Sequence, residues 1–254
     1  DDGVLTISGN GDMTDYDYGK SPFYKNASIK SVVIENGVTS IGYYTFYDCT
    51  NLENITIPDT VVSIGRLAFS GTKWLEKKQE ENPLVIVNGI IIDGETCSGD
   101  VVIPDSVTSI GESAFEVCED ITSITMSDSV TSIGDLAFEY CTNLTNVKIS
   151  NSITSIGDSV FSHCFKLENI TIPDMVTSIG NMAFICCESI TSIVIPESVT
   201  SIDDNAFCGC TKLENIIIPD SVKSIGRDAF DHTKWIDNKR EENPLVIVNS
   251  ILID

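Results

Sequence analysis

Apolar residues recur along the chain in one fixed pattern. Written from its first apolar position, the unit reads LxxIxIPxxVxSIGxxAFxxC, as in Leu167–Cys187. Successive units place a phenylalanine every 23 residues, with one gap of 46, at Phe46, Phe69, Phe115, Phe138, Phe161, Phe184, Phe207 and Phe230. A serine-isoleucine pair keeps the same spacing from Ser40 to Ser224. A period of this length without slippage predicts a repeat solenoid in which each coil is one unit.

The spacing within the unit predicts its elements. Ile170 and Ile172 lie two apart, which predicts a strand with these two side chains on one face and Asn169 and Thr171 on the other. The proline that follows ends the strand and begins a turn. A second short strand, VTSIG, then leads to an AFxxC segment that we predict to be a helical turn. Stacked units can bury what one unit cannot, because each apolar residue meets its own copy about 4.8 Å along the axis.

The repeat resembles a known family. The phrase IPDSVTSIGESAFEVC, from Ile103 to Cys118, is similar to the BspA-like branch of the leucine-rich repeats, and eight copies extend this resemblance over nearly the whole chain. The resemblance implies a right-handed α/β superhelix that is rich in β-structure, secretion or cell-surface display, and a role in adhesion or protein binding. Where other leucine-rich repeats carry a buried asparagine, this chain has Thr60, Ser106, Ser129, Ser152, Met175, Ser198 and Ser221. We therefore expect the serine of the TSIG phrase to satisfy the backbone between coils.

Two regions depart from the repeat. Residues 1–28 begin with an alternating VLTIS and are similar to the opening of BspA-like proteins, so we assign 1–28 as an N-terminal cap and 29–254 as the solenoid. The 46-residue gap contains TKWLEKKQEENPLVIVNGIIID, and a copy with 16 of 22 residues identical runs from Thr233 to Asp254. WLEKKQEEN is compatible with a helix, and the Asn-Gly between apolar runs predicts a hairpin with a primed turn. We thus predict irregular helix-plus-hairpin modules at 72–97 and 233–254, either protruding recognition elements or structural variants, with the chain ending in mid-repeat.

The charge balance excludes some functions. The chain carries 38 acidic and 15 basic residues, a net charge of −23. Nucleic acid is therefore an unsuitable partner, because phosphate requires a basic surface. No apolar run approaches the roughly 18 residues of a membrane span. The first residues also lack the basic and apolar regions of a signal peptide. The expectation of an extracellular or cell-surface location therefore depends on the family resemblance.

The cysteines suggest packing rather than chemistry. Six of the nine share one repeat position: Cys49, Cys118, Cys141, Cys164, Cys187 and Cys210. One thiol per coil in a line cannot surround zinc tetrahedrally, whereas a buried free cysteine packs as a small apolar side chain. Thr72 and Thr233 replace this cysteine where the modules begin, as a packing position permits. A bridge between the off-ladder residues Cys186 and Cys208 remains open, and Cys97 is unassigned.

Neither the histidines nor the carboxylates indicate catalysis. His163 and His232 are the only histidines, and neither belongs to a recognisable triad, so we expect no enzymatic activity and no cofactor. A polar ladder follows the strand ends, at Asn36, Asp59, Asp105, Asp128, Asn151, Asp174, Glu197 and Asp220. We interpret this ladder as turn formation, with weak calcium binding as the alternative.

The outward positions of the strands form the candidate binding face. Leucine-rich repeats usually bind partners there, and in this chain the face is small and polar, without aromatic or arginine anchors. The candidate residues are Asn54, Thr56, Ser123, Thr125, Asn146, Lys148, Asn169, Thr171, Ser192 and Asn215. We expect protein or extracellular-matrix partners, with a structural spacer as the alternative. A carbohydrate-binding module comes third, because the strand face lacks aromatic side chains.

Overall fold

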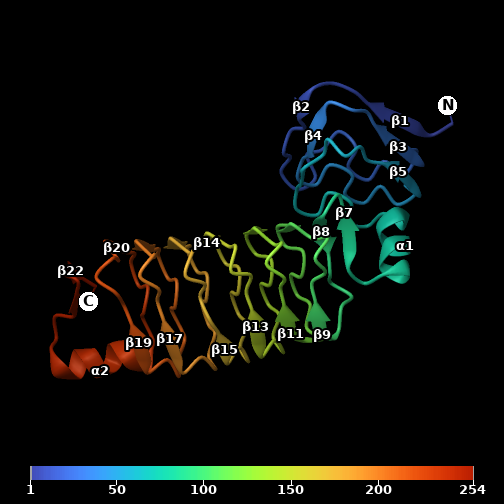
Figure 1. Cartoon of the computed structure of the whole chain (residues 1–254). Helices are drawn as coiled ribbons and strands as arrows, with labels where there is room; N and C mark the ends of the chain where they lie inside the picture. The colour runs from blue at the N-terminus through green and yellow to red at the C-terminus, as the bar shows by residue number, and fades with distance from the viewer. Residues whose placement is uncertain (1, 254) are drawn as a thin grey trace. The chain divides into compact units, whose positions relative to one another are not determined.

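Parallel strands stacked coil upon coil make up the chain, as the repeat predicts. The computed structural model describes residues 2–253 and has two compact units, Asp1–Gly94 and Glu95–Asp254. Residues one repeat apart pair in register, for example Val32 with Ile55 and Val147 with Ile170. The β-solenoid is therefore confirmed. Among the described residues it contains two helices, α1 (Lys73–Glu81) and α2 (Lys234–Glu242) (Figure 1).

The first unit has two parallel sheets and a hairpin. One sheet contains β1 (Val4–Ile7), β3 (Ser31–Ile34) and β5 (Asn54–Thr56). The other contains β2 (Gly11–Asp12), β4 (Val38–Ile41) and β6 (Ser63–Ile64). The antiparallel hairpin after α1 consists of β7 (Val85–Val87) and β8 (Ile90–Asp93).

The second unit also has two rows of parallel strands. Its longer strands form one row of β9 (Gly99–Val102), β11 (Ile121–Thr125), β13 (Asn146–Lys148) and β15 (Asn169–Ile170), followed by the separate pair β17 (Ser192–Val194) and β19 (Asn215–Ile217). The two-residue strands of the other row are β10 (Ser109–Ile110), β12 (Ser132–Ile133), β14 (Ser155–Ile156), β16 (Ser178–Ile179), β18 (Ser201–Ile202) and β20 (Ser224–Ile225). A hairpin of β21 (Ile247–Val248) and β22 (Ile251–Leu252) follows α2.

Phenylalanines fill the core of each unit. The ring centroids of Phe138 and Phe161 are 5.5 Å apart with the planes only 5° from parallel, and the neighbouring coils repeat this stack. Each aromatic pair contributes about 0.5–1.5 kcal/mol beyond the burial of its area. In each unit a tryptophan of the irregular module packs at an angle on the last phenylalanine, Trp74 on Phe69 at 4.8 Å and Trp235 on Phe230 at 5.0 Å.

The AFxxC segments are turns and not the helical turns that we predicted. Leu136 and Tyr140 have φ angles of 61° and 58°, in the left-handed region. Their N–H groups donate to the next coil, from Leu136 to Asp158 O at 3.0 Å and from Tyr140 to Ser162 O at 2.9 Å. A helix would direct these donors to its own carbonyls. The bonds between coils offset the roughly 1–2 kcal/mol that each left-handed residue costs.

Both irregular modules form the predicted helix and hairpin. At the tip of the first hairpin, Asn88 and Gly89 have φ angles of 49° and 78°, as a primed turn requires. The Asn88 amide also donates to Pro58 O at 2.8 Å and to Val61 O at 2.9 Å. The hairpin tip is thus attached to an ordinary coil of its own unit.

The N-terminal segment forms a coil on the repeat. Strand β1 pairs in parallel with β3, and the Phe23 ring stacks on Phe46 at 5.6 Å. Phe23 therefore occupies the repeat phenylalanine position, 23 residues before Phe46, a relation that our sequence alignment omitted. The assignment of 1–28 as a cap stays a prediction.

Candidate functional site

The cysteine ladder is buried, as predicted, and it also forms hydrogen bonds. Each ladder thiol donates to a backbone carbonyl of the preceding coil; Cys141 Sγ lies 3.1 Å from Phe115 O and Cys164 Sγ lies 3.2 Å from Phe138 O. Burial raises the pKa of Cys118 to about 12, and it raises those of the other ladder thiols as well. A neutral, inaccessible thiol is no nucleophile, so this ladder is structural.

The expectation for the TSIG serines is wrong. All eight of these serines are half-exposed or exposed, and for example Ser132 Oγ bonds to another serine, Ser109 Oγ, at 2.9 Å. At four of the seven positions that replace the asparagine of other leucine-rich repeats, Thr60, Ser129, Ser152 and Ser198, the hydroxyl donates to a carbonyl of the preceding coil instead. Ser129 Oγ donates to Val107 O at 2.8 Å and Ser198 Oγ donates to Val176 O at 2.6 Å. The TSIG serine does not bond to the backbone between coils because its side chain points outward, between a buried valine and a buried isoleucine of the same segment.

The remaining cysteines form no bridge. Cys186 and Cys208 are half-exposed and both are free thiols, so the bridge left open by the sequence is absent. Cys97 is buried, and its carbonyl accepts the Cys118 thiol at 3.2 Å.

One histidine has a serine and a glutamate beside it, without forming a catalytic arrangement. His163 Nδ1 lies 2.7 Å from Ser162 Oγ, which also contacts Glu139 Oε1 at 3.1 Å. The imidazole stacks on Tyr140, with centroids 4.4 Å apart. The Ser162 side chain is 1% exposed, so its hydroxyl is inaccessible to a substrate.

One member of the polar ladder after the strands accepts a hydrogen bond from a backbone amide. Asp128 Oδ1 accepts from Asn151 N at 3.0 Å, one coil away. Within residues 2–253, no three or more histidine, cysteine, aspartate or glutamate side chains are grouped to hold a metal ion. The turn interpretation accounts for this contact, and weak calcium binding stays an alternative to be tested.

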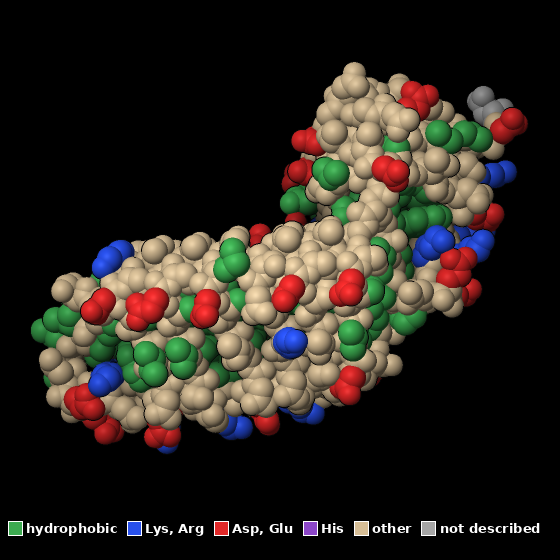
Figure 2. Space-filling model, viewed as in Figure 1, with side chains coloured by type: hydrophobic (Ala, Val, Ile, Leu, Met, Phe, Trp, Pro, Cys, Tyr) green, Lys and Arg blue, Asp and Glu red, His purple; other side chains and the backbone are tan. Residues whose placement is uncertain are grey.

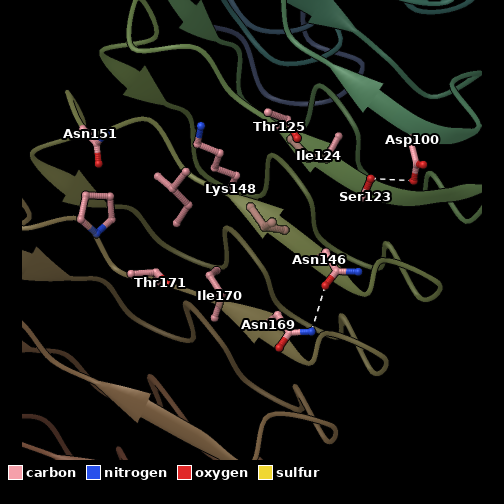
Figure 3. Close-up of a pocket in the computed structure, with 13 residues that line it drawn as sticks. Asp100, Ser123, Ile124, Thr125, Asn146, Lys148, Asn151, Asn169, Ile170 and Thr171 are labelled. Carbon is pink, nitrogen blue, oxygen red and sulfur yellow. Dashed lines mark hydrogen bonds between the residues drawn. The ribbon is translucent and has the colours of Figure 1, made fainter.

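A shallow hollow of about 660 Å³ lies on the strand face of the second unit (Figure 3). Strands β9, β11, β13 and β15 form its floor. It is lined by Asp100, Ser123, Ile124, Thr125, Asn146, Val147, Lys148, Ile149, Asn151, Asn169, Ile170, Thr171 and Pro173. One margin lies where the strand row stops at β15: Ile170 there is half-buried, whereas its counterparts Val147 and Ile193 are buried.

The hollow brings together six of the ten candidate residues of the strand face, namely Ser123, Thr125, Asn146, Lys148, Asn169 and Thr171. The other four lie outside it. Asn54 and Thr56 are exposed on β5 of the first unit, and Ser192 and Asn215 are exposed on the separate β17–β19 pair. Three polar residues of the lining, Asp100, Asn151 and Asn169, lie at or beside strand ends. The first two were absent from the ten candidates, although the position of Asn151 in the polar ladder was a usable signal.

Hydrogen bonds fix most of the polar groups in the hollow. Asn169 Nδ2 donates to Asn146 Oδ1 at 2.9 Å, and Ser123 Oγ donates to Asp100 Oδ1 at 2.6 Å. Hydrogen bonds from Ser123 and, to a smaller extent, from Thr122 lower the pKa of the Asp100 carboxyl. Lys148 extends away from both bonded pairs (Figure 3), and its ammonium has no partner among residues 2–253. The site therefore offers one cation and several oriented amides.

The comparisons with known proteins follow the repeat. The BspA type leucine-rich repeat region matches six copies, over residues 17–141, 94–205 and 177–245. The chain belongs to the BspA-type leucine-rich repeat family. No curated protein matches the sequence. No helix within residues 2–253 is long and apolar enough to cross a bilayer.

Solved structures of three bacterial leucine-rich repeat proteins are similar to this member of the family. A leucine rich cell surface protein from Faecalibacterium prausnitzii is 32% identical, with a TM-score of 0.54. The match covers 74% of this chain and 59% of the Faecalibacterium chain. A leucine-rich repeat protein from Bacteroides ovatus is 28% identical, with a TM-score of 0.52, and the match covers 86% of this chain and 53% of the Bacteroides chain. One from Eubacterium ventriosum is 20% identical, with a TM-score of 0.50, covering 92% and 91%, and it supports the fold alone. The match to this chain thus spans little more than half the length of each of the first two proteins.

Proposed function

We propose that this chain is a non-enzymatic module of a cell-surface or secreted protein, and that it binds protein or extracellular-matrix partners through the hollow of its second unit. The observation that carries the proposal is the convergence of Asn146, Lys148, Asn169 and Thr171 on one strand face. Amide side chains both donate and accept, which suits the peptide groups of a protein loop. The name of the Faecalibacterium protein, which includes the cell surface, supports the location.

Charge favours a partner with an acidic or neutral contact residue at the centre of the hollow. Lys148 is the one lysine or arginine of the lining, and it lies among uncharged asparagines and threonines. A carboxylate from the partner would gain a charged hydrogen bond there. The whole chain, at a net charge of −23, disfavours a partner that is strongly acidic overall.

Alanine substitution tests the hollow. We would immobilise the chain, measure the binding of purified collagen, laminin and fibronectin, and repeat it with Asn146, Lys148, Asn169 and Thr171 all changed to alanine. Loss of an anchoring cluster weakens affinity at least about tenfold. These residues lie exposed on the strand face, so the variant keeps the thermal unfolding midpoint of the parent.

The first unit supplies a matched control. Asn54 and Thr56 occupy the same repeat positions as Asn146 and Lys148, are equally exposed, and lie outside the hollow. Changing both to alanine leaves the affinity unchanged if the hollow is the site. Equal losses in the two variants, or no binding by the parent chain, would contradict the proposal, and the second result would favour the spacer.

A further inference from the structure

Four of the seven tyrosines in the chain gather at one place in the first unit. Tyr24 lies on the N-terminal coil, and Tyr47 lies 23 residues later on the next coil, so the repeat register stacks their rings at 6.0 Å and 20°. Tyr44 lies three residues before Tyr47, with ring centroids 5.8 Å apart. Tyr18 comes from the preceding loop, and its ring plane lies at 66° to 85° to those of the other three, with centroids 5.3 to 5.8 Å apart. We name Tyr18, Tyr24, Tyr44 and Tyr47 the tyrosine patch.

Solenoid packing does not require the tyrosine patch. At the repeat position that Tyr24 and Tyr47 share, the later coils carry Ser70, Glu116, Glu139, Ser162, Ile185, Cys208 and Asp231, none of them aromatic. The core at this point is already closed by Phe46, which is fully buried. Tyr18 remains 59% exposed. The aromatic side chains therefore present a surface instead of filling an interior.

Polar groups surround the rings of the patch. The side chain of Tyr24 raises the pKa of Tyr18 to about 12, and the side chain of Tyr18 lowers the pKa of Tyr24. The Lys25 ammonium lies 5.1 Å from the centre of the Tyr24 ring and 3.8 Å from the Asp48 carboxylate. Lys25 and Asp48 cancel each other's charge, so the patch is locally neutral in a chain of net charge −23.

We propose that the tyrosine patch is a binding site for a neutral carbohydrate. A pyranose ring has an apolar C–H face, which packs on an exposed aromatic ring, and hydroxyls at its edge. Here Tyr18 offers the ring, while the tyrosine hydroxyls, Asp48 and Lys25 offer donors and acceptors at its border. An anionic polysaccharide would be repelled by the net charge of the chain. The patch exposes roughly the area of one or two tyrosine side chains, small beside the ~800 Å² that each partner contributes to a stable protein–protein interface.

Native affinity electrophoresis tests this proposal, since the acidic chain migrates readily in such gels. The probes are soluble β-glucan, arabinoxylan, galactomannan and starch cast into the gel, with hyaluronate as the anionic comparison. We expect at least one neutral polysaccharide to retard the chain and hyaluronate to leave it unretarded. Tyr18→Ala should weaken this retardation at least about tenfold in dissociation constant, whereas Tyr18→Phe should keep most of it.

Two control variants locate the site. Tyr140→Ala removes a tyrosine that is 40% exposed in the second unit, and Lys148→Ala removes the cation of the hollow; both should be retarded like the parent chain. Tyr18→Ala removes three ring contacts and should lower the unfolding midpoint somewhat, whereas Tyr18→Phe keeps the ring and should keep the midpoint of the parent. The proposal is overturned if no neutral polysaccharide retards the parent, or if Tyr18→Ala is retarded as strongly as the parent. It is also overturned if Tyr18→Ala loses the binding of a protein partner and keeps the binding of the polysaccharide.

Discussion

At the scale of single residues, the ladder cysteine both fills space in the core and forms a hydrogen bond between coils. Phe138 O accepts two donors, Cys141 N from its own coil and Cys164 Sγ from the next, each at 3.2 Å. The thiol therefore connects one turn to its neighbour at the point where the phenylalanine rings stack. Valine or alanine would fill the same space without this bond, which accounts for a thiol at six positions of the ladder.

The ladder thiols make stability fall at alkaline pH. Burial raises the pKa of Cys164, whereas in the unfolded chain a thiol ionises near pH 8.5. Above that pH the unfolded chain holds fewer protons than the folded one, so each ladder thiol lowers the free energy of unfolding by about 1.4 kcal/mol per pH unit. Cys164→Ala, measured by urea unfolding between pH 8 and 9.5, should reduce the slope by up to this amount as the unfolded thiol ionises. Cys208→Ala, at a half-exposed position, is the control, and equal slopes in both variants would contradict the assignment.

At the scale of elements, threonine in place of cysteine is what starts each module. Thr72 Oγ1 donates to Phe69 O at 2.7 Å and also accepts from Leu75 N at 3.2 Å, which caps α1. Thr233 does the same for α2, through Phe230 O and Ile236 N. A thiol is a weak acceptor, so the replacement that we interpreted as tolerated packing in fact permits a helix.

Removing this cap should destabilise the first module. Thr72→Ala should lower the free energy of unfolding by about 1–2 kcal/mol, because it leaves the first turn of α1 without its acceptor. Thr72→Ser keeps the hydroxyl and should lose much less. Urea unfolding of the three proteins measures the difference, and amide exchange should increase at Leu75 in the alanine variant alone. A serine variant as unstable as the alanine variant would mean that the methyl packing, and not the cap, is what matters.

Elements with local signals were predictable from the sequence, and elements closed by contacts between coils were not. The hairpin follows from the Asn-Gly turn at Asn88 and from an apolar run on either side of it, and the helix follows from the polar segment WLEKKQEEN. The turn around Leu136 and Tyr140 does not, since neither residue favours a positive φ by itself. Its conformation is imposed by carbonyls one coil away. The TSIG serine was misassigned for the same reason, as its outward direction depends on the corner between two strand rows.

At the scale of the whole molecule, the sequence predicted which strand face carries the candidate site, but it did not predict where on that face the hollow lies. Alternation identified which side chains point outward, and six of them line the hollow. The interruption of the strand row after β15 limits the hollow, and nothing in the sequence at Asn169 or Ile170 marks it. The tyrosine patch shows the complementary case: the register between Tyr24 and Tyr47 was readable, while the approach of Tyr18 depends on the path of a loop.

The net charge of −23 makes the last prediction one about the whole chain. Acidic side chains recur in a row across the viewed face of the second unit (Figure 2). In the polar ladder, Asp128 Oδ1 accepts from Asn151 N. The mutual repulsion of the acidic side chains is screened as the Debye length shortens from about 30 Å at 0.01 M salt to about 3 Å at 1 M. The unfolding midpoint should therefore rise with sodium chloride, and calcium and magnesium chlorides should act alike at equal ionic strength.

Asp128→Asn separates repulsion from specific calcium binding. The asparagine keeps the oxygen that accepts Asn151 N and removes one charge of the ladder. The variant should therefore melt above the parent at low salt and converge with it at high salt, because only the repulsion has changed. Differential scanning calorimetry in the three salts measures both effects. A stabilisation by calcium that magnesium does not reproduce, and that Asp128→Asn abolishes, would instead establish the polar ladder as a calcium site.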